Sequence, residues 1–289
     1  MTRDVLGAIE LGGTKIKVAT GTGDGTIITE LSFPTAGPDA VFESIRQYFG
    51  INRVTAIGVG AFGPVSVSPR SRQFGRIGNT PKPGWAGFDI VEALAPLNVP
   101  IAIDTDVNAA LLGEAFWGAA ADCNVAVYLT VGTGIGGGLL VDGRPVHGLL
   151  HPEMGHMRVL RAPGDDLHSL CPFHGDCAEG LASGPAIMAR FGVTLSTLPV
   201  DHHGHNLIAN YIAQVCVNII LVTSPEVIVI GGGVMATPRL ISSVETQIEY
   251  MLHDYLRDKN SRPCKILKPS TGDSAALLGA LILARNVDI

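Results

Sequence analysis

The sequence lacks any excess of basic residues. Its 20 Lys and Arg residues face 26 Asp and Glu residues, which gives a formal net charge of −6. This balance excludes the basic surface that proteins use to bind a nucleic-acid backbone. Charged residues of both signs are scarce, at 16% against roughly 25% in an average soluble domain. The 289 residues are enough for two domains or one large one, and the composition excludes a disordered chain.

The sequence also lacks a convincing secretion signal or membrane span. No basic stretch with an apolar core precedes the first expected strand, so we expect a cytoplasmic protein. Two stretches are uncharged: residues 123–141 contain five glycines around a turn, and residues 206–225 carry polar side chains four residues apart. These patterns favour a glycine turn and an amphipathic helix over a span. The five cysteines are an odd number, which argues against a disulfide framework.

Short apolar runs bounded by glycine alternate with helical patterns, which favours an α/β architecture. The expected strands are residues 6–11, 16–19, 54–60, 101–104, 125–131, 138–141 and 227–230. The expected helices are residues 39–49, 107–117, 182–191, 207–222, 238–256 and 274–284.

An internal sequence repeat indicates that the chain is duplicated. Residues 6–16 and 126–136 both show a strand, a Gly/Thr turn and a second strand, and Gly12 aligns with Gly132. We expect two related α/β lobes, residues 1–117 and 118–289, that face each other across a cleft. The last helix is expected to pack back on the first lobe.

Three glycine-rich turns favour nucleotide binding. Gly12, Gly13, Thr14 and Lys15 offer backbone amides, a hydroxyl group and a positive charge to phosphate oxygens, although one such turn alone predicts only a hairpin. The second turn, residues 130–138, contains Thr133 and Gly134 and is richer in glycine. The third turn, after a buried strand, consists of Gly231, Gly232 and Gly233. The sequence contains no Walker pattern, which disfavours a P-loop fold.

Asp104, Thr105 and Asp106 follow the expected strand 101–104, at the edge of the sheet where α/β proteins place their chemistry. A kinase needs one carboxylate there to accept the proton of the acceptor hydroxyl. An aspartate at this position is equally typical of a helix N-cap. The spacing alone leaves both interpretations of Asp106 open.

Two histidines and two cysteines predict a zinc site. Cys171, His174 and Cys177 are spaced by three residues in a turn with Pro and Gly, and His156 supplies a fourth donor. Four such donors complete a tetrahedral structural site and leave no open position for catalysis. The alternatives are a metal-free loop and a site in which His168 replaces one of the four ligands.

The motifs together resemble the ROK family of sugar kinases, and within it the zinc-containing bacterial fructokinases. The resemblance extends from about residue 5 to 284 and rests on five segments in the family's order: residues 10–15, 104–110, 130–138, 153–156 and 171–180. It implies an actin-like (ASKHA, ribonuclease H-like) fold with two duplicated lobes and a cleft between them. It also implies MgATP as the phosphoryl donor, a hexose as the acceptor, a structural zinc ion beside the sugar and a homodimer.

The family pattern assigns a role to each matching residue. Asp106 is implied as the general base, and the position before it, usually Asn, is Thr105 here, which puts that sugar contact in doubt. Asn79, Glu153, His156 and Glu179 match positions that bind sugar hydroxyls. Carboxylate, imidazole and amide groups suit a polyol, because each can pair with hydroxyls.

The resemblance implies D-fructose as substrate and D-fructose 6-phosphate as product. Mannose, glucose and an N-acetylhexosamine are alternative acceptors, since neither Glu10 nor the overall likeness identifies which sugar is bound. A sugar-sensing ROK regulator is a rival from another class, but the first strand begins near residue 5, where such regulators carry a DNA-binding segment, and the net charge is negative. A non-catalytic actin-like scaffold would have no use for the Glu153 and Glu179 pair.

Overall fold

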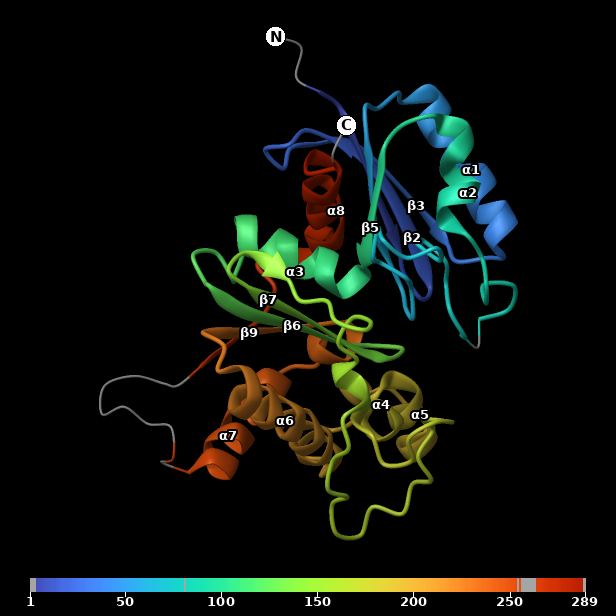
Figure 1. Cartoon of the computed structure of the whole chain (residues 1–289). Coiled ribbons are helices and arrows are strands. Elements are labelled where there is room, and N and C mark those ends of the chain that lie inside the picture. Colours follow the sequence, from blue (N-terminus) through green and yellow to red (C-terminus); the bar gives the residue numbers. More distant parts are fainter. Residues whose placement is uncertain (1–3, 81, 254, 256–263, 288–289) are drawn as a thin grey trace. The chain divides into compact units, whose positions relative to one another are not determined.

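The computed structural model describes residues 4–80, 82–253, 255 and 264–287. The chain divides into two compact units, which are labelled by element in Figure 1. Unit 1 comprises residues 1–121, 145–151 and 271–289, and unit 2 comprises residues 122–144 and 152–270. The sequence alone placed residues 118–289 in one lobe apart from the last helix, so the assignment of residues 145–151 to unit 1 is a difference from that expectation.

Unit 1 is built on a five-stranded sheet in the order β3-β2-β1-β4-β5. β1 pairs antiparallel with β2 and parallel with β4, and β4 pairs parallel with β5. The strands are β1 (Leu6–Leu11), β2 (Lys15–Gly21), β3 (Ile27–Pro34), β4 (Ile57–Ala61) and β5 (Ile101–Thr105). β1 and β4 are buried almost throughout, because helices cover both faces of the sheet.

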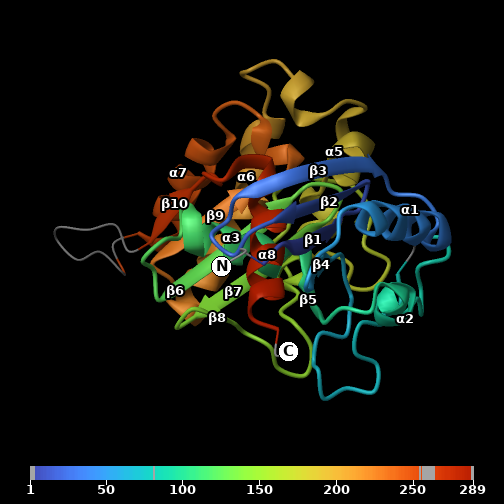
Figure 2. The same ribbon diagram turned by 90° about the horizontal axis from the view of Figure 1, so that it is seen from above.

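The helices of unit 1 cover opposite faces of this sheet, as Figure 2 shows. They are α1 (Pro38–Ile51), α2 (Ile90–Leu94), η1 (Ala95–Leu97), α3 (Asp106–Trp117), η5 (Gly272–Ser274) and α8 (Ala275–Arg285). α1 begins with Pro38 at its first turn and buries Val41, Phe42, Ile45 and Phe49, which recur at helical spacing. On the other face, α8 contacts β1, β4 and α3 although it comes from the end of the chain.

Unit 2 repeats the same sheet, which confirms the predicted duplication. Its strand order is β10-β9-β6-β7-β8, with β6 antiparallel to β7 and parallel to β9. The strands are β6 (Val125–Val131), β7 (Ile135–Val141), β8 (Arg144–Pro145), β9 (Val227–Gly231) and β10 (Lys265–Leu267). β6 therefore takes the place of β1, and β7 the place of β2, as the alignment of Gly12 with Gly132 predicted.

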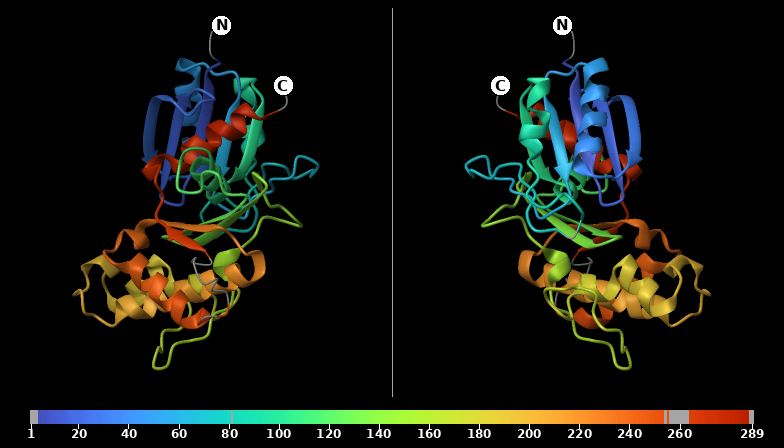
Figure 3. Two further views of the ribbon diagram at one scale, coloured as in Figure 1. Left: turned by 90° about the vertical axis from the view of Figure 1, so that its left-hand side faces the viewer. Right: turned by 90° about the vertical axis from the view of Figure 1, so that its right-hand side faces the viewer.

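The helices of unit 2 are mostly grouped together, and Figure 3 shows α6 and α7 side by side. They are η2 (Met154–His156), α4 (Ala178–Ala182), α5 (Gly184–Phe191), η3 (Leu195–Thr197), α6 (Gly204–Thr223), η4 (Gly233–Ala236) and α7 (Leu240–Leu252). By length and composition α6 could cross a membrane, and half of its apolar window is buried inside the protein.

The strands and helices that differ from the prediction have weak local signals. β3 was not predicted because it is an edge strand whose side chains are mostly exposed. β10 has only three residues. The expected helix 182–191 is two helices, because Ser183 adopts an extended conformation between α4 and α5. The expected helix 238–256 begins at Leu240 and ends at Leu252, and residues 254 and 256 lie outside the described part of the chain.

Glycines allow α3 and α8 to approach each other at backbone distance. A Cβ atom on Gly279 of α8 would lie 1.7 Å from the carbonyl oxygen of Ala109 in α3, and one on Gly113 would lie 2.2 Å from that of Ala275. Any side chain at these positions would push the helices apart. Since α3 begins at Asp106, this packing fixes the part of the helix that carries the proposed base.

We expect Gly279→Ala to lower the free energy of unfolding by about 2 kcal/mol or more, because the added methyl group meets backbone atoms that cannot move aside. Gly50→Ala is the matched control, since Gly50 lies in α1 with open space around its Cα. There the higher helix propensity of alanine should raise stability by up to about 1 kcal/mol. Urea denaturation followed by circular dichroism measures both, and equal effects of the two substitutions would contradict this account.

Candidate active site and metal centre

Asp106 lies at the first position of α3, directly after β5, and a neighbouring residue caps the helix. The hydroxyl of Thr105 accepts a hydrogen bond from the Asn108 amide at 3.1 Å, so Thr105 is the N-cap. The sequence interpretation of Asp106 as the N-cap is therefore wrong. The buried side chain of Thr105 therefore has a structural role, because the cap positions Asp106 at the start of the helix.

Glu10 at the end of β1 is largely withdrawn from water beside this aspartate. Burial raises the pKa of Glu10, Lys17 opposes that rise, and the negative charge of Asp106 adds to it. Lys17 Nζ lies 3.5 Å from Glu10 Oε2 and donates a hydrogen bond to the carbonyl of Asp273. Within the described part of the chain, Glu10 Oε2 is buried and accepts no hydrogen bond. A cation or a ligand donor can therefore be accommodated at this oxygen.

The first glycine turn is positioned for an anion. Gly12 N donates to Lys15 O at 3.1 Å, which closes the turn between β1 and β2. Among the described residues, the amides of Gly13 and Thr14 donate to no backbone carbonyl. Successive unpaired amides of this kind form a concave anion site.

Lys82 meets this turn from a loop far along the sequence. Its Nζ donates a hydrogen bond to Gly13 O at 2.6 Å and lies 4.8 Å from the centre of the Phe62 ring. Burial lowers the pKa of Lys82, while the charge of Asp106 opposes this. Lys82 lies three residues after Asn79 in the sequence. Asn79 itself is exposed on that loop in unit 1.

His147 is a second residue that sequence reasoning did not place near Asp106. It lies in the segment 145–151 of unit 1, and its Nε2 lies 3.0 Å from Asp104 Oδ2. Asn108 Nδ2 donates to Asp104 Oδ1 at 2.7 Å. The hydrogen bond with Asp104 raises the pKa of His147, burial lowers it, and the net shift is upward. This network fixes the end of β5 immediately before Thr105 and Asp106.

In unit 2 the second glycine turn is tied to Glu179 of α4. Glu179 Oε2 accepts a hydrogen bond from Ile135 N at 2.9 Å, and a Cβ on Gly134 would lie 2.6 Å from the same oxygen. Gly132 O accepts a hydrogen bond from Gly184 N, the first residue of α5. Thr133 is left exposed at the tip of the turn. The turn is therefore held from both sides, with Gly134 in close contact with Glu179.

The structure brings together the two histidines and two cysteines that the sequence predicted as ligands. The donor atoms of His156, Cys171, His174 and Cys177 all lie within 4.8 Å of one another. Cys171 Sγ and Cys177 Sγ each lie 3.7 Å from His156 Nδ1, and the two Nδ1 atoms are 3.1 Å apart. His168 is exposed and is not part of this group. The four residues form a cluster of the kind that holds a metal ion.

His156 connects this cluster to the proposed sugar-binding carboxylates. Its Nδ1 faces the cysteines, and its Nε2 lies 3.8 Å from Glu179 Oε1. Burial raises the pKa of Glu153, His156 lowers it and Glu179 raises it again. Three of the four proposed sugar contacts, Glu153, His156 and Glu179, are thus neighbours within unit 2. Asn79 is in unit 1.

An ion-pair network, which sequence reasoning missed, supports the segment that carries the cluster. Arg161 pairs with Asp176, one residue before Cys177, and donates to the carbonyl of Asp165 at 2.9 Å. Asp165 accepts hydrogen bonds from Arg190 of α5 and Tyr211 of α6 at 2.9 and 2.6 Å. Burial alone would raise the pKa of Asp165, but these hydrogen bonds outweigh it and the pKa is lowered. The charged partners come from segments too far apart in sequence to form a motif.

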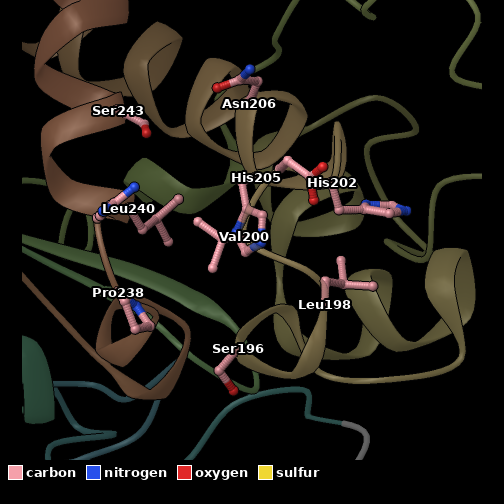
Figure 4. Close-up of a pocket in the computed structure, with 11 residues that line it drawn as sticks. Ser196, Leu198, Val200, His202, His205, Asn206, Pro238, Leu240 and Ser243 are labelled. Atoms are coloured by element: carbon pink, nitrogen blue, oxygen red, sulfur yellow. The ribbon is translucent and has the colours of Figure 1, made fainter.

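The third glycine turn leads to a pocket of about 500 Å³ in unit 2, shown in Figure 4. Gly232 has a φ of 93°, and a Cβ there would lie 2.4 Å from Val131 O, so only glycine fits. Both the start of α6 and the residues at the start of α7 line the pocket. Its lining includes Val200, His205, Asn206, Pro238, Leu240 and Ser243. The volume and the mixed apolar and polar lining are typical of a small-molecule site.

The chain is similar to known proteins over nearly its whole length. The profile of the ROK family matches residues 6–287. The fructokinases of Pediococcus pentosaceus and Zymomonas mobilis are each 39% identical to this chain, over 97% and 98% of it and 98% and 97% of their own lengths. The crystal structure of a ROK family glucokinase from Streptomyces griseus in complex with glucose and AMPPNP has a TM-score of 0.79 at 21% identity, covering 97% of this chain and 99% of that one. The latter likeness shows the same fold.

We expect the pair of His147 and Asp104 to stabilise unit 1 most at low pH. A histidine whose pKa is raised on folding contributes in full below its unfolded pKa of about 6.5 and loses that contribution as the pH rises through the folded pKa. The difference in unfolding free energy between wild type and His147→Gln should thus be largest below pH about 6 and shrink above it. It should not exceed about 1 kcal/mol, because the pair is partly exposed. Denaturation at several pH values measures it, and a difference that grows with pH would contradict the pairing.

Proposed function

The chain belongs to the ROK family, and on this basis we propose that it is an ATP-dependent hexose kinase that phosphorylates D-fructose on its 6-hydroxyl. The observation that carries the proposal is the group around Asp106, directly after β5. The buried Glu10 lies beside this aspartate, and Lys82 donates a hydrogen bond to the first glycine turn. The fructokinase relatives support the choice of fructose, since they are 39% identical over nearly their full lengths.

Asp106 is proposed as the general base. The sugar hydroxyl gives its proton to the Asp106 carboxylate while its oxygen attacks the γ-phosphorus, and the bond from that phosphorus to the bridging oxygen breaks. The electron pair of this bond leaves with ADP. The N-cap at Thr105 and the network of Asp104, Asn108 and His147 hold the carboxylate in place.

The phosphates are proposed to bind the two related glycine turns. In unit 1 the amides of Gly13 and Thr14 supply hydrogen bonds, and Gly12 permits the tight turn. Lys15 is exposed beside them and adds positive charge. In unit 2, Thr133 and Gly134 provide the corresponding contacts.

Magnesium fits the buried carboxylate of Glu10. The orphaned Oε2 atom is an oxygen ligand of the type that Mg²⁺ prefers, directly or through a water molecule. When bound with ATP, Mg²⁺ neutralises phosphate charge during transfer. Burial raises the pKa of Glu10, so a nearby cation would favour its charged form.

The sugar is proposed to contact Asn79, Glu153, His156 and Glu179. Carboxylates accept hydrogen bonds from hydroxyls, and the Asn79 amide and the His156 imidazole can both donate and accept. Thr105 is not retained in this set, because its buried hydroxyl caps α3.

A structural zinc ion fits the cluster of His156, Cys171, His174 and Cys177. Zn–N bonds near 2.05 Å and Zn–S bonds near 2.3 Å place tetrahedral ligands roughly 3.3–3.8 Å apart. The sulfur–nitrogen distances of 3.5–3.7 Å lie in that range, the two Nδ1 atoms are slightly closer at 3.1 Å, and all four donor atoms lie within 4.8 Å of one another. Four protein ligands leave no open position, so the ion would supply rigidity. His156 would bind it through Nδ1 and keep Nε2 for the sugar and Glu179.

The base of ATP is proposed to occupy the pocket after the Gly231, Gly232 and Gly233 turn. Leu240 and Pro238 offer apolar surface to a purine, while Asn206 and Ser243 offer hydrogen bonds. A cytoplasmic location and a homodimer complete the proposal, and the latter rests on the family resemblance. Mannose, glucose and N-acetylhexosamines stay as alternative acceptors, because no contact above distinguishes one hexose from another.

We expect the purified protein to release ADP from MgATP most strongly with fructose, because the relatives that it matches over nearly its full length are fructokinases. The assay compares fructose, mannose, glucose, N-acetylmannosamine and a no-sugar control. Turnover with a different sugar alone would retain the kinase mechanism and overturn the specificity. No sugar-dependent release from folded, zinc-replete protein would overturn the kinase.

Asp106→Asn should reduce kcat by about 10³-fold or more, since the amide cannot accept the proton and removal of a general base costs typically 10²–10⁴-fold. Fructose binding, measured by calorimetry, and the melting temperature should stay near wild type. Activity within threefold of wild type would remove Asp106 as the base.

We expect about one zinc ion per chain in protein prepared without a His tag, because the four donors form a closed tetrahedral set. Cys177→Ser should lose most of the metal, as measured by elemental analysis, and weaken fructose binding by loosening His156. Cys123→Ser is the control, a partly exposed thiol outside the cluster. Zinc that stays substoichiometric in wild type after reconstitution would contradict the assignment.

A further inference from the structure

Lys82 lies near Asp106 but has no part in the phosphoryl transfer as proposed above. The side chain reaches from the segment of residues 82–88 to the first glycine turn, where its Nζ lies 2.6 Å from Gly13 O. It also lies over the Phe62 ring, with 4.8 Å between Nζ and the ring centre. All these residues belong to unit 1, so their arrangement does not depend on unit 2.

These contacts hold the ammonium group without neutralising its charge. A backbone carbonyl and an aromatic face attract a cation, but neither carries a full negative charge. Burial lowers the pKa of Lys82, which shows that the charged form is costly at this place. The charge of Asp106 reaches Lys82 and partly offsets the cost. A bound anion would offset more of it.

The groups around Lys82 Nζ favour the binding of an anion. The amides of Gly13 and Thr14 have no backbone acceptor among the described residues, and Lys82 is bonded to the carbonyl of the same Gly13. An ammonium group has three N–H donors, of which Gly13 O takes one. Lys17 cannot play this part, because it is buried against Glu10 and the carbonyl of Asp273.

We infer that Lys82 is a further catalytic residue, whose ammonium group contacts the γ-phosphoryl group as it moves from ATP to the sugar hydroxyl. The inference rests on the proposed kinase function. As the oxygen–phosphorus bond to the sugar forms and the bond to the bridging oxygen breaks, the proton passes to Asp106 and the electron pair leaves with ADP. Lys82 exchanges no proton and stabilises the charge on the phosphoryl oxygens.

Lys82 could instead act only as a tether that holds the loop carrying Asn79 against the glycine turn. The chain offers a matched control for that role. Trp85 lies on the same loop, and its Nε1 donates a hydrogen bond to Ala36 O at 3.0 Å. Trp85→Phe removes this tether, keeps an aromatic ring among Phe42, Phe62 and Phe88, and changes no charge near Asp106.

The experiment measures kcat and KM for fructose in wild type, Lys82→Met, Lys82→Arg and Trp85→Phe. Calorimetry with AMPPNP and fructose measures binding, and melting temperatures check folding. Lys82→Met should lower kcat about 100-fold or more, as expected for loss of one charged donor to the transition state. Its fructose affinity should change by less than about threefold. Lys82→Arg should recover at least about tenfold of the lost kcat, because it restores the charge, and Trp85→Phe should keep kcat within about threefold.

The inference would be overturned if Lys82→Met kept kcat within about threefold of wild type. A raised KM for fructose beside that retained kcat would identify Lys82 as a tether. Both results presuppose a wild type that phosphorylates a sugar, so absence of sugar-dependent turnover in wild type would instead count against the proposed function.

Discussion

The close packing of α3 against α8 fixes the position of Asp106, the proposed general base. Gly113 and Gly279 let the two helix backbones meet, and Gly58 of β4 lies against α8 in the same way. The buried Glu114 secures the far end of α3, since it accepts hydrogen bonds from Ala119 N at 2.6 Å and Thr271 N at 2.9 Å. Those two amides lie near two of the four positions where the chain passes from one unit to the other, after residue 121 and before residue 271. One helix therefore carries the proposed base at its start and anchors both of these connections at its end.

Charge is concentrated around Asp106 in a chain that otherwise has little of it. Glu10 and Asp106 repel each other, and Lys17 and Lys82 supply compensating positive charge from β2 and from the segment of residues 82–88. Burial works against the charged forms of Glu10 and Lys82, so these groups are costly to bury and each lies near an opposite charge. Glu10 Oε2 lies 3.5 Å from Lys17 Nζ but accepts no hydrogen bond among the described residues, which leaves it able to accept one from a ligand.

Unit 2 holds proposed sugar contacts on a segment with little regular structure. Between β8 and α4 the described chain contains only the short helix η2. Such a segment buries few apolar side chains, and cross-links have to replace a core. The histidine and cysteine cluster links its two ends, and Arg161 with Asp165 ties it to α5 and α6. Glu179 then connects the segment to the second glycine turn through Ile135 N.

The sequence by itself determined the parts whose signal is local. Strands such as residues 6–11 and 125–131, the duplicated strand-turn-strand pattern, the glycine turns and the spacing of Cys171, His174 and Cys177 could all be predicted, because composition and periodicity act over a few residues. Edge strand β3 was not predicted, since exposed strands carry little hydrophobic pattern. For Asp106 the sequence left the N-cap and general-base interpretations open, and the structure places the N-cap one residue earlier, at Thr105. Only the tertiary structure decided which distant groups meet. Lys82 reaches Gly13 across 69 positions, His147 reaches Asp104 across 43, and Lys17 reaches Asp273 across 256. Side-chain hydrogen bonds depend on distances of about 3 Å between atoms, and no periodicity in the sequence records which loops the fold brings that close.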